Sequence, residues 1–144
     1  MHDPFELERF VAAQEAGGTF EAAVEELRNG RKTSHWMWFV FPQIAGLGHS
    51  AMAQRYAISS LDEARAYLQH PVLAPRLLDA ADIVAQTAGA TAKDIFGAID
   101  ARKLQSCMTL FLRAAPTEPV FSKVLGLFYD GIPDRATDEL LGFT

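Results

Sequence analysis

Apolar residues recur at helical spacing along most of this chain. Leu7, Phe10 and Val11 lie at positions i, i+3 and i+4, which places them on one face of a helix. Glycine, proline and residues that cap helix N-termini separate this segment from others with the same period. The further helices are expected near Thr19, Ser60, Pro71, Thr91, Asp100, Thr117 or Glu118, and Leu140. The pattern predicts a mainly α fold of about six to eight helices.

The segment 36–41 departs from this pattern, because its sequence, Trp-Met-Trp-Phe-Val-Phe, is entirely apolar. A short run of aromatic and β-branched residues that stops at Pro42 favours a buried strand or an extended core segment, with a buried helical turn as the alternative. We therefore expect at most a short β or extended element near residues 36–41. Gly46 and Gly48 indicate a loop after it, and the conformation of residues 51–59 is left unassigned.

The length of 144 residues fits a single globular domain, residues 1–144. The longest apolar run has six residues, whereas a membrane-spanning helix needs about 20. The N-terminus lacks a basic segment followed by an apolar one, which is the pattern of a signal peptide. A single cysteine, Cys107, excludes an internal disulfide. We expect a cytoplasmic protein with no membrane partner, and the oligomeric state stays unknown.

The charge is distributed unevenly along the chain. The formal net charge is -5, yet residues 27–61 contain no acidic residue and carry four cations, Arg28, Arg31, Lys32 and Arg55. The remaining chain has 9 basic and 18 acidic residues, a net charge of -9. A long nucleic acid is an unfavourable partner for a protein with this acidic remainder, because like charges repel. A small anionic ligand at the basic segment is compatible with the same distribution.

The segment 30–50 combines the residue types that an anion site uses. Arg31 and Lys32 offer positive charge, and the Ser34 hydroxyl offers a hydrogen-bond donor. The remaining predicted ligand-binding residues are Trp36 or Trp38 for stacking on a ring, Gln43 for reading a polar edge, and His49. His35 is the candidate catalytic acid or base, because histidine titrates near neutral pH.

Structural explanations exist for the same residues. The two tryptophans can be core anchors, Arg31 and Lys32 can be solvated at a helix end, and the two glycines can simply form a turn. The four histidines lack the spacing of a helical metal motif, so we expect no metal and no cofactor. Asp100, Arg102 and Lys103 form a charged cluster that is a second-choice contributor to any site.

Several segments carry a resemblance to a known family. They are Gly-Arg-Lys-x-Ser-His-Trp-Met-Trp-Phe-Val-Phe-Pro-Gln at 30–43, Gly-Leu-Gly-x-Ser at 46–50, Tyr-Ala-Ile-Ser-Ser-Leu-Asp-Glu-Ala at 56–64, His70-Pro71, Ile95-Phe96-Gly97 with Asp100, and Lys103-Leu104-x-Ser106 leading to Met108-Thr109-Leu110-Phe111. From about Leu7 to Leu141 the chain resembles the family of domain of unknown function 1810.

This resemblance implies a small, mainly helical bacterial protein, similar to a mycobacterial hypothetical protein, with at most a minor β element. It supplies no assigned catalytic residue. Some members carry the label calpastatin, which implies calpain inhibition. We discount that label, because calpastatins are largely disordered whereas this composition is that of a packed domain.

Two functions follow from the sequence. The first is binding of a small anion, such as a nucleotide or a sugar phosphate, in the segment 31–50, with enzymatic activity left uncertain. The second is a non-catalytic interaction or structural module whose basic segment pairs with acidic groups of a partner or of its own fold.

Overall fold

The computed structural model describes residues 3–87 and 89–143. The α-helices in these residues are α1 (Glu8–Glu15), α2 (Thr19–Arg28), α3 (Met37–Val40), α4 (Ala51–Arg55), α5 (Leu61–Tyr67), α6 (Leu73–Ala85), α7 (Ala92–Ala114), α8 (Pro119–Phe128) and α9 (Arg135–Leu141). A 3-10 turn, Ala16–Gly18, links α1 to α2. Seven of these α-helices have seven or more residues, in agreement with the mainly α fold predicted from periodicity.

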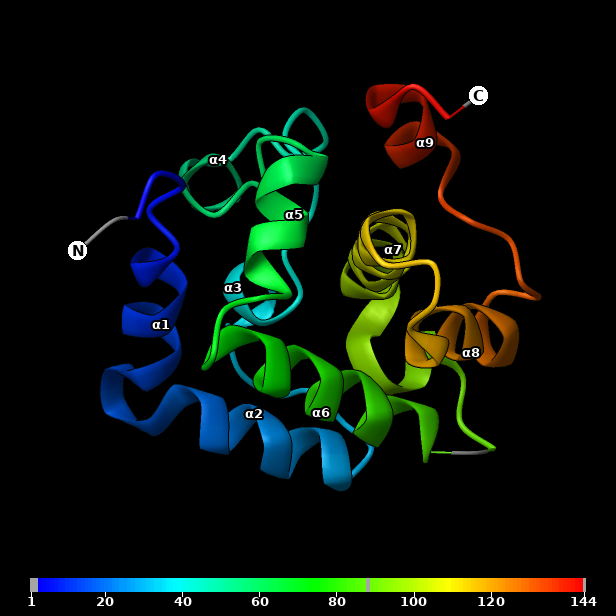
Figure 1. The fold of residues 1–144 in the computed structure, drawn as a ribbon. Coiled ribbons are helices and arrows are strands. Elements are labelled where there is room, and N and C mark those ends of the chain that lie inside the picture. The colour runs from blue at the N-terminus through cyan, green and yellow to red at the C-terminus, as the bar shows by residue number, and fades with distance from the viewer. Residues whose placement is uncertain (1–2, 88, 144) are drawn as a thin grey trace.

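The helices pack around α7. α5, α8 and α9 contact α7, and α6 contacts both α2 and α8. Figure 1 shows α2 and α6 along the lower edge of the molecule, α7 near its centre and α9 at the C-terminal end. α1 packs against α2 and α3. The short helix α3 therefore lies against α1, and the loop before it reaches α7 through the hydrogen bond from the Lys32 amide to the Ile95 carbonyl.

Aromatic side chains connect the layers of the core. The ring of Tyr67 lies 5.2 Å from that of Phe10 and 5.3 Å from that of Phe111, and Phe111 lies 5.8 Å from Phe121. All four side chains are fully buried or nearly so. Rings at such separations in tilted or edge-to-face arrangements stabilise a core beyond the area that they bury. The chain of contacts joins α1, α5, α7 and α8.

The segment 36–41 adopts the buried helical turn, so the preferred expectation of a strand or extended segment was wrong. The amide of Val40 donates to the carbonyl of Trp36 at 3.1 Å, and that of Phe41 donates to Met37 at 3.0 Å. Because this turn is covered on several sides, its side chains are apolar all round, which removes the amphipathic stripe that would have identified a helix. The small β element lies elsewhere, as an isolated parallel bridge between Ile44 and Ile58.

Two other features clarify the predicted boundaries. The helices expected after Thr91 and after Asp100 form one element, α7, with a kink at Gly97, where φ is 80° and ψ is 164°. Thr91 and Asp94 form a reciprocal capping box at its N-terminus. Across the described residues, no helix is both long enough and apolar enough to span a bilayer.

Candidate functional site

The Glu26 carboxylate, at the end of α2, organises the first half of the predicted site. It accepts hydrogen bonds from the amides of Thr33 at 2.7 Å and Ser34 at 3.0 Å, from the Ser34 hydroxyl, and from Nε1 of Trp36 at 3.0 Å. Trp36 itself is fully buried. Ser34 and Trp36 are therefore hydrogen-bonded within the fold. The burial of Trp36 agrees with its interpretation as a core residue.

The hydrogen bonds on Glu26 alter its acidity. Burial by itself raises the pKa of this carboxyl group, but the donors from Ser34, Thr33 and Trp36 outweigh that effect and lower the pKa from 4.5 to about 2. The carboxylate is therefore ionised at neutral pH, and its negative charge lies beside the basic segment. Sequence reasoning missed this residue, because Glu26 precedes the acid-free block and gives no sign of the loop that folds back onto it.

Lys32 makes internal contacts as well. Its Nζ lies 2.9 Å from Oδ2 of Asp100 and donates to the carbonyl of Ser34 at 2.6 Å. The other carboxylate oxygen of Asp100 lies 3.4 Å from Nζ of Lys103. Asp100 thus bridges a lysine of the predicted segment and a lysine of α7. The charged cluster at residues 100–103, the secondary candidate for a ligand site, therefore contacts the main candidate segment, residues 31–50.

Arg31, His35 and His49 have exposed side chains. Among the described residues, the side chains of these three make no hydrogen bond or ion pair. None of them lines either of the two cavities considered below. The structure therefore brings Lys32, Ser34 and Trp36 together, places Trp38 and Gln43 at a cavity, and leaves Arg31, His35 and His49 on the surface.

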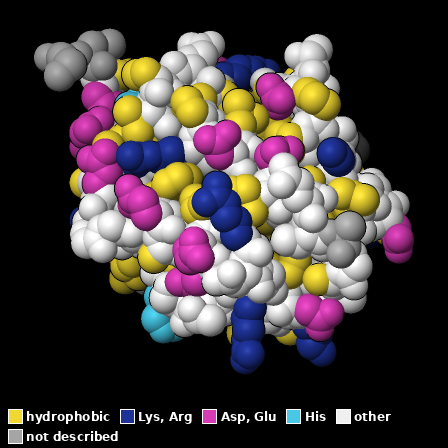
Figure 2. Space-filling view, turned by 90° about the horizontal axis from the view of Figure 1, so that it is seen from below, with side chains coloured by type: hydrophobic (Ala, Val, Ile, Leu, Met, Phe, Trp, Pro, Cys, Tyr) yellow, Lys and Arg dark blue, Asp and Glu magenta, His cyan; other side chains and the backbone are white. Residues whose placement is uncertain are grey.

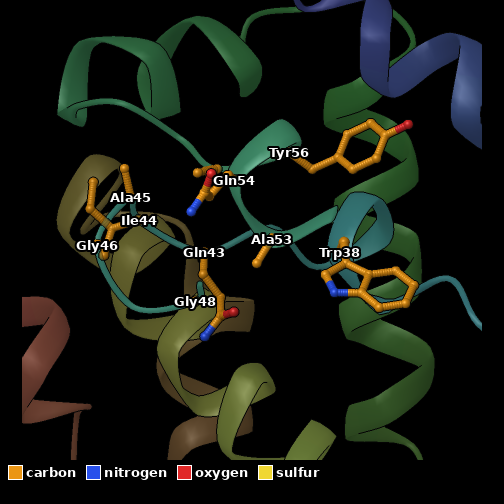
Figure 3. Close-up of a pocket in the computed structure, with 10 residues that line it drawn as sticks. Trp38, Gln43, Ile44, Ala45, Gly46, Gly48, Ala53, Gln54 and Tyr56 are labelled. Atoms are coloured by element: carbon orange, nitrogen blue, oxygen red, sulfur yellow. The ribbon is translucent and has the colours of Figure 1, made fainter. Parts of the chain in front are cut away.

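A cavity of about 150 Å³, called here the inner cavity, lies beside α3 and α4. Its lining residues are Trp38, Gln43, Ile44, Ala45, Gly46, Gly48, Ala53, Gln54, Tyr56 and Ala57. Figure 3 shows Gln43, Gly48 and Ala53 near its centre, with Trp38 on one side and Ala45 on the other. Within the described chain, the Gln43 side-chain amide has no hydrogen-bond partner, so both its donor and its acceptor are available to a ligand.

A second cavity of about 280 Å³, called here the outer cleft, adjoins the first. It lies between the loop 43–48, α7 and the start of α9, and is lined by Gln43, Leu47, Gly48, Ile99, Arg102, Lys103, Gln105, Ser106, Asp134 and Ala136. Arg102 is exposed and forms no ion pair with any residue in the described ranges. Lys103 also lies with its Nζ 5.2 Å from the ring centre of Trp38.

Asp134 has a structural role at the edge of the outer cleft. It is the N-cap of α9, and its Oδ2 accepts hydrogen bonds from the amide of Thr137 at 3.1 Å and from the Thr137 hydroxyl. The Ser106 hydroxyl lies 3.1 Å from the same oxygen. These neutral donors stabilise the Asp134 carboxylate, which keeps its negative charge beside the two cations of the cleft lining, Arg102 and Lys103.

Gly46 and Gly48, the two glycines of the loop after α3, are each required for a different structural reason. A Cβ atom on Gly48 would lie 2.5 Å from Cβ of Ala53, so glycine lets the loop touch α4. Gly46 has a φ of 106°, a conformation that side-chain-bearing residues rarely adopt, and a Cβ atom there would lie 3.3 Å from the Leu140 side chain. Gly48 therefore lies in the wall of both cavities, and Gly46 lies in the wall of the inner cavity.

The α2–α6 face differs from the outer cleft in its charge. A groove of about 880 Å³ on this face is lined by Phe20, Glu21, Val24, Glu25, Arg28, Arg76, Asp79, Asp82, Ile83, Gln86 and Thr87. Figure 2 views the molecule from this side and shows acidic, basic and apolar side chains interspersed. The groove has no dominant chemistry that would define a ligand.

Metal binding has no geometric support in residues 3–87 and 89–143, where no three His, Cys, Asp or Glu side chains come together in a way that could hold an ion. Cys107 is fully buried, and burial raises the pKa of its thiol. It is therefore a structural residue of the core.

Comparisons with known proteins find one matching family and a similar solved structure. The family described as "Protein of unknown function (DUF1810)" matches residues 4–141. The crystal structure of a conserved hypothetical protein from Mycobacterium tuberculosis is similar, with 52% sequence identity and a TM-score of 0.94, over 99% of this chain and 100% of that one. A search of curated proteins finds no match.

Proposed function

Since this chain belongs to the DUF1810 family, which is described as having no known function, we propose a function from its own geometry: it binds a small anion, such as a nucleotide or a sugar phosphate, in the outer cleft. Gln43 and Gly48 come from the segment 31–50, and Arg102 and Lys103 come from α7. The proposal keeps the ligand class that the sequence indicated and moves the anion-binding charges from Arg31 and Lys32 to α7.

One observation carries this proposal: Arg102 and Gln43 line the same cleft, and within the described residues neither side chain has a protein partner. The Arg102 guanidinium can donate two parallel hydrogen bonds to a phosphate or carboxylate, and Lys103, held by Asp100, adds a second positive charge. The volume of about 280 Å³ is close to the lower end of the range, about 300–1,000 Å³, in which small-molecule sites usually fall.

The lining of the outer cleft contains two cations, Arg102 and Lys103, and one carboxylate, Asp134, so its formal charge is net positive. Asp100 already bridges Lys32 and Lys103, and Asp134 accepts the donors of Thr137. Arg102 forms no ion pair among the described residues, and its side chain reaches solvent. An anion from solution can neutralise it without breaking an existing pair.

The cleft supports binding more than catalysis. Its lining residues include no histidine, and His35 lies outside it. The role of His35 as an acid or base, and of Arg31 as an anion ligand, stays a prediction of the sequence. Both can be tested beside the cleft residues in the same titration.

The test is calorimetric titration of the purified protein with pyrophosphate, ribose 5-phosphate and nucleoside monophosphates. We expect binding that weakens about tenfold or more in Arg102→Gln, because a charge-assisted hydrogen bond contributes about 1.5–3 kcal/mol. The matched control, Arg31→Gln, removes an exposed arginine from the edge of the segment and is expected to bind as the wild type does. Equal binding by Arg102→Gln and the wild type would contradict the proposal.

The ion pair of Lys32 with Asp100 favours a second candidate, in which the basic segment pairs with acidic groups of its own fold or of a partner and binds no small ligand. Lys32 is nearly buried and its partner is internal. Under this account, none of the phosphorylated compounds binds to the folded protein, and Lys32→Gln lowers the stability. The titration therefore separates the two candidates.

A further inference from the structure

We propose that the ligand is a nucleoside phosphate whose base occupies the inner cavity while its phosphate occupies the outer cleft. This inference rests on the proposed function, and it selects nucleotides over sugar phosphates. The two cavities adjoin, because Gln43 and Gly48 line both of them. A ligand that fills both must therefore carry an anionic group at one end and a group suited to the inner cavity at the other.

The inner cavity has the chemistry of a site for a planar ring. The half-buried Trp38 supplies aromatic surface, and the small side chains of Ala45 and Ala53 leave room between the loop and α4. A cavity of about 150 Å³ is large enough to admit an aromatic ring. A sugar phosphate has no flat apolar face with which to occupy this surface.

Two amide side chains provide polar recognition there. Gln54 donates its Nε2 to the carbonyl of His49 at 3.2 Å, which leaves its side-chain oxygen as an acceptor. The Gln43 amide is free in the described structure, and it offers one donor group and one acceptor. The edge of a nucleobase carries donors and acceptors in the same plane as its ring, so one ligand can satisfy the aromatic surface and both amides.

Lys103 connects the two parts of the site. Its ammonium lies 5.2 Å from the ring centre of Trp38, on the inner-cavity wall, and it also lines the outer cleft. The cation–π contact and the ion pair with Asp100 together hold Lys103 between the two cavities. A phosphate bound beside Lys103 is therefore adjacent to the ring-binding surface.

The test compares dissociation constants for nucleoside 5′-monophosphates and ribose 5-phosphate, which share the phosphate and the ribose. Stacking of a base on an aromatic side chain contributes about 1–3 kcal/mol, so we expect at least one of the nucleotides to bind about tenfold tighter than ribose 5-phosphate. The variant Ala45→Phe places a large ring on the inner-cavity lining, at an exposed position that does not line the outer cleft. It is expected to remove this preference and to leave the affinity for ribose 5-phosphate within about twofold of the wild type.

The control variant Ala12→Phe places the same side chain at an exposed position on α1 and is expected to keep the nucleotide preference. Thermal unfolding of both variants verifies that they fold. If ribose 5-phosphate binds as tightly as every nucleotide, or if Ala45→Phe retains the preference, this inference is wrong while anion binding stands. If neither the nucleotides nor ribose 5-phosphate bind, both this inference and the proposed function are wrong.

Discussion

The Glu26 carboxylate accepts a hydrogen bond of 3.0 Å from Nε1 of the buried Trp36, ten residues farther along the chain. The same carboxylate accepts the amides of Thr33 and Ser34. This one side chain therefore fixes the course of the loop between α2 and α3 and satisfies the indole of a core tryptophan. Glu26, which precedes the acid-free residues 27–61, therefore determines the conformation of the first part of that segment.

Replacing Glu26 by glutamine is expected to lower the free energy of unfolding at pH 7 by about 1–2 kcal/mol. The amide is uncharged, and its NH2 group cannot accept the hydrogens that one carboxylate oxygen accepts. Chemical denaturation followed by tryptophan fluorescence measures the loss. The control is Glu25→Gln, an exposed neighbour, which is expected to change the stability by less than about 0.5 kcal/mol.

The effect of Glu26 also has a defined pH dependence. Its pKa is lowered to about 2 in the folded protein from 4.5. A lowered pKa contributes stability that is complete above about 4.5 and is lost as the pH falls toward 2. The difference in stability between the wild type and Glu26→Gln is therefore expected to shrink across this window. A difference that stays constant from pH 7 to pH 2.5 would show that the hydrogen bonds do not depend on the ionised carboxylate.

The contact between Gly48 and Ala53 predicts a large cost for one methyl group. In Gly48→Ala the new Cβ would lie 2.5 Å from Cβ of Ala53, so the loop or α4 must move, and we expect a loss of about 1–3 kcal/mol. Gly126→Ala is the matched control, because Gly126 lies inside α8 with open space around it and alanine favours helix. Thermal denaturation is expected to show opposite signs for the two variants, and a neutral Gly48→Ala would mean that the close approach is absent.

The ion pair of Lys32 and Asp100 is expected to couple more strongly than a surface pair. The two side chains are only 9% and 19% exposed, with a distance of 2.9 Å. A double-mutant cycle with Lys32→Gln and Asp100→Asn is expected to give a coupling energy of about 1 kcal/mol or more. The comparison is Arg65 with Asp62, which lie 3.5 Å apart with exposures of 51% and 82%. That pair is expected to give about 0.5 kcal/mol or less, and equal couplings would contradict the assignment of Lys32 as a structural residue.

Cys107 is expected to be unreactive while the protein is folded. It is fully buried and burial raises the pKa of its thiol, so little thiolate is present and reagents cannot reach it. A thiol-disulfide reagent is expected to modify the native protein at least about a hundredfold more slowly than the chain unfolded in guanidinium. Rapid modification at low denaturant would place Cys107 in a region that opens locally.

Local signals in the sequence predicted most of the helices, because stripes and caps depend on residues three or four positions apart. Thr91 with Asp94 is such a case, and Glu118 as the residue before α8 is another. The turn at 36–41 could not be identified in this way, since its burial on several sides erases the periodicity. Its aromatic residues predicted a core position correctly for Trp36, while Trp38 is only half-buried at a cavity.

The candidate site was predictable only in part. The segment 31–50 contributes Gln43 and Gly48 to both cavities, and the cluster 100–103 was already a secondary candidate. What the sequence could not indicate is that Asp100 reaches Lys32 across 68 positions of chain. Such contacts depend on how helices pack, and no local spacing encodes them in a single sequence.

The most direct test of anion binding in the outer cleft is nuclear magnetic resonance. Amide shifts of the ¹⁵N-labelled protein would be followed during titration with pyrophosphate and with a nucleoside monophosphate. We expect saturable shifts at residues 43–48 and 102–106 with both compounds and further shifts at residues 53–57 with the nucleotide, while the residues around Arg31 and His35 stay unaffected. Saturable shifts confined to residues 31–35, or no saturable shift with any compound, would contradict anion binding in the outer cleft.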